Sequence, residues 1–186
     1  MVSTSDFRNG LVMKFEGDIY SISEFQHVKP GKGGAFVRTK LKNIKTGRVI
    51  DHTFRSGEKV EDLRLERKQM QYLYGSGNNY VFMDTQNYEQ VEISAAVVGE
   101  ASRFITESME VEVLSIENEV IGVEVPFFVE LEITQTDPGV RGDTAQGGSK
   151  PATLETGAVV SVPLFVEQGE TIKVDTRTCS YVERVK

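Results

Sequence analysis

One lysine stands at the centre of a glycine-rich stretch near the start of the chain. The stretch VKPGKGGAF, residues 28–36, contains three glycines, one proline and the central Lys32, and it has no acidic residue. A lysine amine is a compact charge with three hydrogen-bond donors on a flexible stem, and it is a common target of covalent modification. Two interpretations are open: a soluble hairpin turn, or a bare tip that carries one amine into a narrow phosphate-lined site.

Strand-like runs surround this stretch and must position it. Residues 10–15, 18–28, 35–44 and 48–54 alternate in polarity or are rich in β-branched and aromatic residues, with short turn sequences between them. Four to five short strands in about sixty residues are typical of a small closed or half-closed barrel. The sequence therefore predicts that Lys32 lies at the tip of a β-hairpin.

The rest of the chain is also strand-rich. We predict an all-β protein of three units, 1–64, 65–128 and 129–186, in which the second and third units resemble oligonucleotide-binding barrels, although strand patterns alone do not single out that barrel. One helix is predicted over 95–105, with Ser94 as its N-cap and Gly99 as a weak point inside it.

Charge is distributed unevenly along the chain. The net charge of −7 argues against indiscriminate nucleic-acid binding, yet residues 1–64 carry 12 basic and 8 acidic residues, whereas residues 65–128 carry 3 and 11. Residues 29–48 hold seven basic residues and no acidic one. A basic end can bind phosphates, and the strand within it makes Arg38, Lys40 and Lys42 the candidates for phosphate contacts with a nucleic acid.

Known catalytic motifs are absent from the sequence, so we predict no enzyme, no catalytic residue and no cofactor. Two histidines and the single Cys179 are too few and too scattered for a metal site. The lone cysteine favours the cytoplasm, and no apolar run is long enough to span a membrane.

Two further segments of the sequence each have a structural and a functional interpretation. The glycine-rich loop DPGVRGDTAQGGSK includes Asp143 and Thr144, which either make local turn hydrogen bonds or contact the base edges of single-stranded RNA. In the terminal YVERVK, Tyr181 and Arg184 either belong to an edge strand or supply a stacking ring and a phosphate contact.

Three segments of the chain resemble the bacterial elongation factor P family. They are KPGKGGAFVRTKLKN, FFVELEITQTDPGVRGDTA and KPATLETGAVVSVPLFVEQG. The last fits the third-domain signature of that family at Lys150, Ala152, Gly157, Val160, Val162, Pro163, Val166 and Gly169. The resemblance extends over essentially the whole chain.

The resemblance implies a fold and a function. The fold is an N-terminal SH3-like or KOW-like barrel followed by two OB-fold barrels, in an L-shaped molecule that resembles tRNA. The function is that of a translation elongation factor. It binds the 70S ribosome between the peptidyl and exit sites, stabilises peptidyl-tRNA (initiator or prolyl) and promotes peptide-bond formation at consecutive prolines. The factor itself is expected to be a monomer.

Roles for individual residues also follow from the resemblance. Lys32 aligns with the tip lysine that a modifying enzyme extends, and Pro30, Gly31, Gly33 and Gly34 shape that tip. Gly142, Asp143 and Thr144 match the loop that faces mRNA in the exit site, and Tyr181 and Arg184 match positions near the small subunit. Gly34 departs from the larger polar residue of commoner relatives, which leaves the identity of the modification open.

Two rival interpretations remain. A generic RNA-binding module of β-barrels would tolerate loss of Lys32, whereas the elongation factor would not. A β-rich enzyme that binds carbohydrate through residues 65–128 would need a clustered pair of titratable groups in a pocket, of which the sequence gives no sign.

Overall fold

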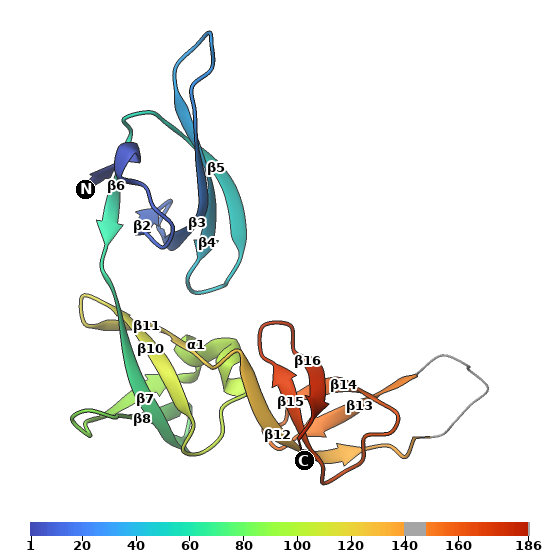
Figure 1. Cartoon of the computed structure of the whole chain (residues 1–186). Helices are drawn as coiled ribbons and strands as arrows, with labels where there is room; N and C mark the ends of the chain where they lie inside the picture. The colour runs from blue at the N-terminus through green and yellow to red at the C-terminus, as the bar shows by residue number, and fades with distance from the viewer. Residues whose placement is uncertain (140–147, 186) are drawn as a thin grey trace. The chain divides into compact units, whose positions relative to one another are not determined.

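The computed structural model describes residues 1–139 and 148–185 and contains three β-sheets. The chain divides into two compact units: residues 1–67 with 114–122, and residues 68–113 with 123–186. Strands dominate every part of the described chain (Figure 1). The prediction of an all-β fold is confirmed.

The first sheet has the strand order β1-β6-β2-β3-β4-β5, and each neighbouring pair is antiparallel. Its elements are β1 (Val2–Ser3), the 3₁₀ helix η1 (Thr4–Asp6), β2 (Val12–Phe15), β3 (Asp18–Val28), β4 (Phe36–Asn43), β5 (Val49–Arg55) and β6 (Lys59–Leu63). The longest pairing joins β3 to β4, and it ends at the loop of residues 29–35. In Figure 1 this hairpin extends beyond the rest of its sheet.

Strand β4 shows why this sheet folds as it does. Its residues alternate between buried and exposed, so that Val37 and Leu41 enter the core while Arg38 and Lys42 face solvent. Phe54 of β5 is buried in the same core, where its ring contacts those of Phe7 and Phe15 edge-on.

The second sheet has the order β11-β10-β7-β8-β9. Its elements are β7 (Leu65–Ser76), β8 (Asn79–Asp84), β9 (Gln90–Ser94), α1 (Ala95–Val98), the 3₁₀ helix η2 (Gly99–Arg103), β10 (Glu110–Ile116) and β11 (Glu119–Glu124). A turn at Glu117 and Asn118 joins β10 to β11, and both residues have positive φ, as a type I′ hairpin turn requires.

The predicted helix over 95–105 is wrong in its extent. Only one α-helical turn forms, because Gly99 takes φ +56° and ends it, and η2 continues in its place. Ser94 occupies the N-cap position, but its side chain makes no capping hydrogen bond. The buried ring of Phe104, which directly follows η2, packs into the core of the third sheet.

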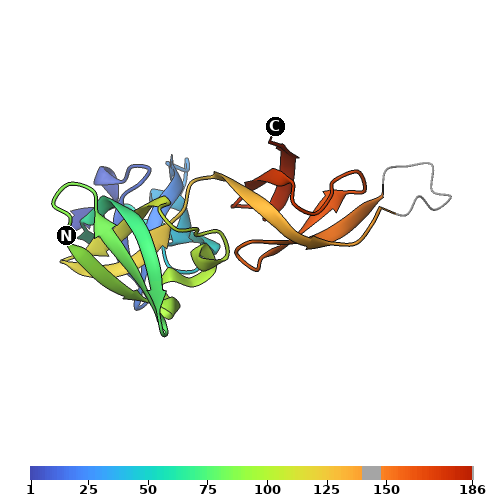
Figure 2. The same ribbon diagram turned by 90° about the horizontal axis from the view of Figure 1, so that it is seen from below.

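The third sheet has the order β14-β13-β12-β15-β16, with every neighbouring pair antiparallel. Its strands are β12 (Phe128–Thr136), β13 (Ser149–Leu154), β14 (Val159–Pro163), β15 (Thr171–Asp175) and β16 (Ser180–Arg184). The long β12 twists along this sheet (Figure 2). Leu131 and Ile133 of β12 are fully buried against Ile172 and Val174 of β15.

Candidate functional site

The loop of residues 29–35 joins β3 to β4, immediately beyond the paired residues Val28 and Phe36. Residues 29–34 are all exposed, as predicted for the tip of a hairpin. Lys32 forms no hydrogen bond or ion pair with any residue that the structure describes. Its amine therefore keeps all three donors available to a ligand.

The glycines of this loop differ in what the backbone requires of them. Gly33 has φ +105°, a conformation that residues with a Cβ rarely adopt. Gly34 and Gly31 have no such φ, and a Cβ built on either of them would meet nothing within 4 Å. The backbone conformation thus requires glycine at position 33. Gly31 and Gly34 are not required in this way, and their effect is to leave the tip without side chains.

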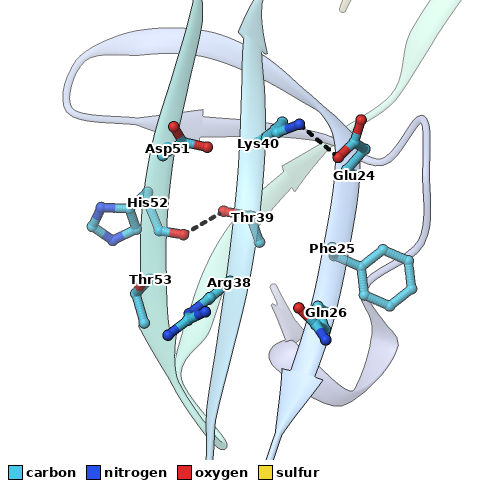
Figure 3. A pocket seen from close by; sticks show the side chains of 9 residues that line it. All are labelled: Glu24, Phe25, Gln26, Arg38, Thr39, Lys40, Asp51, His52 and Thr53. Atoms are coloured by element: carbon cyan, nitrogen blue, oxygen red, sulfur yellow. Dashed lines mark hydrogen bonds and ion pairs between the residues drawn. The ribbon is translucent and has the colours of Figure 1, made fainter.

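The outer face of the same sheet carries the predicted basic residues. Arg38, Lys40 and Lys42 alternate along β4 and are exposed on one face. Arg38 and Lys40 line an open depression of about 410 Å³ on the sheet surface (Figure 3). Its lining residues are Glu24, Phe25, Gln26, Arg38, Thr39, Lys40, Asp51, His52 and Thr53. The sequence-predicted Arg38 and Lys40 are thus brought together, with Lys42 further along the strand.

Lys40 differs from its two neighbours because it already has an anionic partner. Its Nζ lies 2.8 Å from an Oε of Glu24, and Asp51 of β5 is its cross-strand neighbour in the sheet. The hydrogen bond to Glu24, together with the charges of Glu24 and Asp51, raises the pKa of Lys40 above its ordinary value of 10.5. Figure 3 shows the two side chains pointing at each other. Lys40 is therefore the least available cation of the three.

Arg38 has an aromatic neighbour instead of an anionic one. Its guanidinium carbon lies 5.5 Å from the ring centroid of Phe36, which shares the same face of β4. Phe36 was not singled out from the sequence, although the alternation of β4 places it in the row of Arg38. Beneath this face, the buried hydroxyl of Thr39 donates to the carbonyl oxygen of His52 at 2.9 Å and ties β4 to β5.

The predicted residues of the third sheet have partners of their own. Arg184 donates to Glu170 at 2.9 Å, and its guanidinium lies 5.2 Å from the ring centroid of Phe165. Tyr181 is half-buried against the core, and it also lines an open cleft of about 790 Å³ with Phe165. Gly142, Asp143 and Thr144 lie outside the described residues.

The described residues form neither a metal-binding cluster nor a membrane-spanning helix. Within residues 1–139 and 148–185, no three His, Cys, Asp or Glu side chains gather where they could hold a metal ion. In the same residues, no helix has the length and apolar character needed to cross a membrane.

The three sheets match three family models in order along the chain. The elongation factor P KOW-like domain matches residues 3–60, the elongation factor P OB domain matches 65–123, and the C-terminal model of elongation factor P matches 129–184. The first match includes the loop with Lys32 and the basic strand β4. The fold and the site thus define a translation factor that is built from KOW-like and OB-type domains.

Curated relatives agree with these matches over the full chain. Elongation factor P of Pelotomaculum thermopropionicum is 57% identical over 185 residues, and that of Coprothermobacter proteolyticus is 56% identical; all of this chain and of each relative is covered. Elongation factor P of Nocardioides sp. is 53% identical with the same coverage. The chain belongs to the elongation factor P family. Its members are translation elongation factors rather than a family of enzymes.

Solved structures show the same fold in part of the chain. Eukaryotic translation initiation factor 5A from Methanococcus jannaschii has a TM-score of 0.50 and 25% identity, and it covers 67% of this chain and 90% of its own. A translation initiation factor eIF-5A family protein from Naegleria fowleri has a TM-score of 0.52 at 15% identity, with 67% of this chain and 96% of its own covered.

Proposed function

We propose that the chain binds the 70S ribosome between the peptidyl and exit sites and promotes peptide-bond formation at consecutive prolines. The observation that carries this proposal is the amine of Lys32, which stands without a partner at the tip of a glycine-rich hairpin in a chain of the elongation factor P family. Membership of the family supplies the ribosome as partner, and the hairpin supplies the part that reaches the reacting substrate.

The tip acts by positioning rather than by chemistry of its own. Proline is a poor donor and acceptor in peptide transfer, so the reacting groups spend little time in a productive arrangement. Lys32, approaching the CCA end of the peptidyl-tRNA, holds that end close to near-attack geometry. A misplacement of about 1 Å can cost on the order of 100-fold in rate, so a small restraint has a large effect. The ribosome makes the bond.

The basic face of β4 supplies affinity for the tRNA. Arg38 and Lys42 carry exposed charges without an ion pair in the described residues, and both lie on the face that leads toward the tip. Each phosphate that they neutralise releases counterions, which favours binding at low salt. Lys40 contributes less because Glu24 competes for its amine.

A separate enzyme extends Lys32 in this proposal. The exposed side chain and the open space around Gly31 and Gly34 leave room for such an enzyme and for a longer arm. The lysine rules out a modification that requires arginine at the tip. The mass of the chain purified from its native host, with fragmentation across residues 29–38, measures the added group directly.

The third sheet contacts the small-subunit side. We assign Gly142, Asp143 and Thr144 to mRNA in the exit site, and Tyr181 and Arg184 to the neighbouring small subunit. The partners of Arg184 within the chain, Glu170 and Phe165, restrain it, so its contribution to affinity is smaller than that of Arg38. The factor works as a monomer in the cytoplasm.

The test is an add-back experiment in a bacterial translation system that lacks its own factor. Two reporters are compared, one with three consecutive prolines and one without. The chain from its native host restores the proline reporter and leaves the other unchanged. Lys32→Ala fails to restore it, whereas Lys45→Ala, at an exposed turn of the same sheet, restores it fully.

The rival interpretation predicts a different result. A generic RNA-binding module uses the face of β4 but has no need of the tip, so Lys32→Ala and Lys45→Ala would behave alike. Equal activity of the two variants on the proline reporter would refute the proposal in favour of that module.

A further inference from the structure

Two adjacent phenylalanines are exposed at the start of β12. The exposed fraction is 63% for Phe127 and 46% for Phe128, although both belong to a residue type that is usually buried. The guanidinium of Arg177 lies 4.8 Å from the ring centroid of Phe127 and 5.5 Å from that of Phe128. Apolar surface of this kind, bordered by polar groups, marks interaction sites.

Hydrogen bonds hold the Arg177 side chain and the backbone next to the two rings in place. Asp175 accepts from Nε and Nη2 of Arg177 at 3.0 and 2.7 Å. The backbone N–H of Thr176 donates to the carbonyl oxygen of Phe127 at 2.8 Å, and its hydroxyl donates to that of Pro126, also at 2.8 Å. The guanidinium and the backbone that carries the rings are therefore fixed before any partner arrives, which lowers the entropic cost of binding.

The charges around the rings are mostly negative. Phe128, Glu130 and Glu132 share one face of β12, because they alternate along the strand. In the turn after β15, Arg177 is paired with Asp175, and Lys173 of β15, which lies opposite Glu130, is paired with Glu183 at 3.0 Å. Glu130 and Glu132 thus leave the patch with an excess of negative charge, which opposes a nucleic acid and favours a basic protein.

We propose that Phe127, Phe128 and Arg177 form a docking surface for a basic protein segment of the ribosome. This inference rests on the proposed function, since the ribosome supplies the partner. Aromatic residues and arginine are the types that carry most binding energy in protein interfaces. Apolar side chains of the partner cover the two rings, and its lysines or arginines pair with Glu130 and Glu132.

The first test is photo-crosslinking to purified 70S ribosomes. Phe127 is replaced by p-benzoylphenylalanine, and the matched control carries the same residue at Val159, an exposed site in the same sheet. Co-sedimentation verifies that both variants bind ribosomes. We expect position 127 to crosslink to one ribosomal protein, at a lysine- or arginine-rich segment, and position 159 not to do so.

A crosslink from position 127 to RNA or to a second copy of the chain, or no crosslink by a variant that still co-sediments, overturns the docking surface and leaves the proposed function standing. If the unmodified chain does not bind ribosomes at all, the proposed function fails together with the inference. The two failures are thus distinguishable.

The second test changes the charge of the patch and measures affinity for ribosomes, because a basic partner and an acidic partner would change that affinity in opposite directions. Glu130→Lys is expected to weaken ribosome binding about threefold if a basic protein is the partner, while Glu130→Gln changes it less. Phe127→Ala is expected to weaken binding about tenfold. An increase in affinity with Glu130→Lys indicates a polyanion at this surface and refutes the proposal.

Discussion

The first and third sheets both expose arginine beside phenylalanine, but they differ in what the arginine is bonded to. On β4, Arg38 lies over Phe36 and has no ion pair within the described residues. On the third sheet, Arg177 and Arg184 each lie over an aromatic ring and each bind a carboxylate, Asp175 or Glu170. The same residue types therefore build two different surfaces.

This difference is informative about partners. An exposed cation without a counter-charge keeps its attraction for phosphate, and it keeps the counterion release that accompanies phosphate binding. A cation paired with a carboxylate has lost most of that attraction, and its remaining use is to hold aromatic rings in place. The first sheet is thus suited to tRNA, and the third sheet's aromatic patch to protein.

The largest effect on tRNA affinity should come from removing the unpaired cations of β4. Arg38→Ala with Lys42→Ala is expected to weaken tRNA binding roughly tenfold at low salt, and to reduce the slope of log K against log salt by about 2, because two phosphate contacts are lost. The matched double variant, Arg177→Ala with Arg184→Ala, should leave that slope unchanged. Equal changes in slope would remove the distinction between the two faces.

The tip offers a matched pair of glycines. Gly33→Ala forces a side chain into φ +105°, at a cost of roughly 1–2 kcal/mol, so the loop takes another shape. We expect about a fivefold loss in the rate of proline-run synthesis. Gly34 has a φ outside the left-handed region, and a Cβ at this position would meet nothing within 4 Å. The Gly34→Ala variant should therefore support proline-run synthesis at close to the wild-type rate. A larger loss of rate for Gly34→Ala than for Gly33→Ala would show that the absence of side chains at the tip matters more than its backbone conformation.

Removing Glu24 should convert the paired cation of β4 into an unpaired one. In Glu24→Gln the pKa of Lys40 falls back toward its ordinary value, and the amine becomes available to phosphate. Affinity for tRNA is expected to rise about twofold to threefold at low salt. The same change combined with Lys40→Ala should show no gain. Unchanged affinity in Glu24→Gln alone would mean that Lys40 does not contact the tRNA.

The smallest effect concerns the stability of the third sheet at low pH. The hydrogen bond from Arg177 lowers the pKa of Asp175 below its ordinary value of 3.8. The backbone N–H of Glu167 and the side chain of Arg184 lower the pKa of Glu170 below 4.5. Because both folded-state pKa values are lowered, their stabilisation is present above these ordinary values and is lost as pH falls through the lowered ones.

Thermal unfolding between about pH 5 and pH 3 measures this loss, which should be only a few degrees in Tm, since both ion pairs lie at the surface with an exposed arginine. Arg177→Ala with Arg184→Ala should have a lower Tm at neutral pH and a flatter dependence on pH. A variant whose Tm falls with pH as steeply as that of the wild type would show that these pairs do not stabilise the sheet.

Much of the first site could be predicted from sequence. The basic cluster singled out Arg38, Lys40 and Lys42, which the alternation of β4 puts on one exposed face, and glycine with proline correctly indicated a loop around Lys32. The partner of Lys40 could not be predicted in this way. The pairing of β3 with β4 shifts between Ile22 and Glu24, and this irregularity decides which residue lies opposite Lys40.

The aromatic patch of the third sheet could not be predicted for a similar reason. Arg177 and Phe127 are far apart in the sequence, and they meet only because the turn after β15 is hydrogen-bonded to the residues before β12. The extent of the helix at Ala95 was also missed, since a single positive φ at Gly99 ended a pattern that otherwise continued. Local periodicity predicts which residues share one face of a strand, whereas the packing of segments that are distant in sequence decides which charges are neutralised.

The most direct measurement is the rate of peptide-bond formation between two proline codons as the concentration of factor is increased to saturation. For Lys32→Ala we expect a saturating rate reduced by up to about 100-fold with a nearly unchanged half-saturating concentration, because the tip positions the substrate. For Arg38→Ala with Lys42→Ala we expect a higher half-saturating concentration and a wild-type rate at saturation. A wild-type saturating rate for Lys32→Ala would show that its amine does not act in peptide transfer.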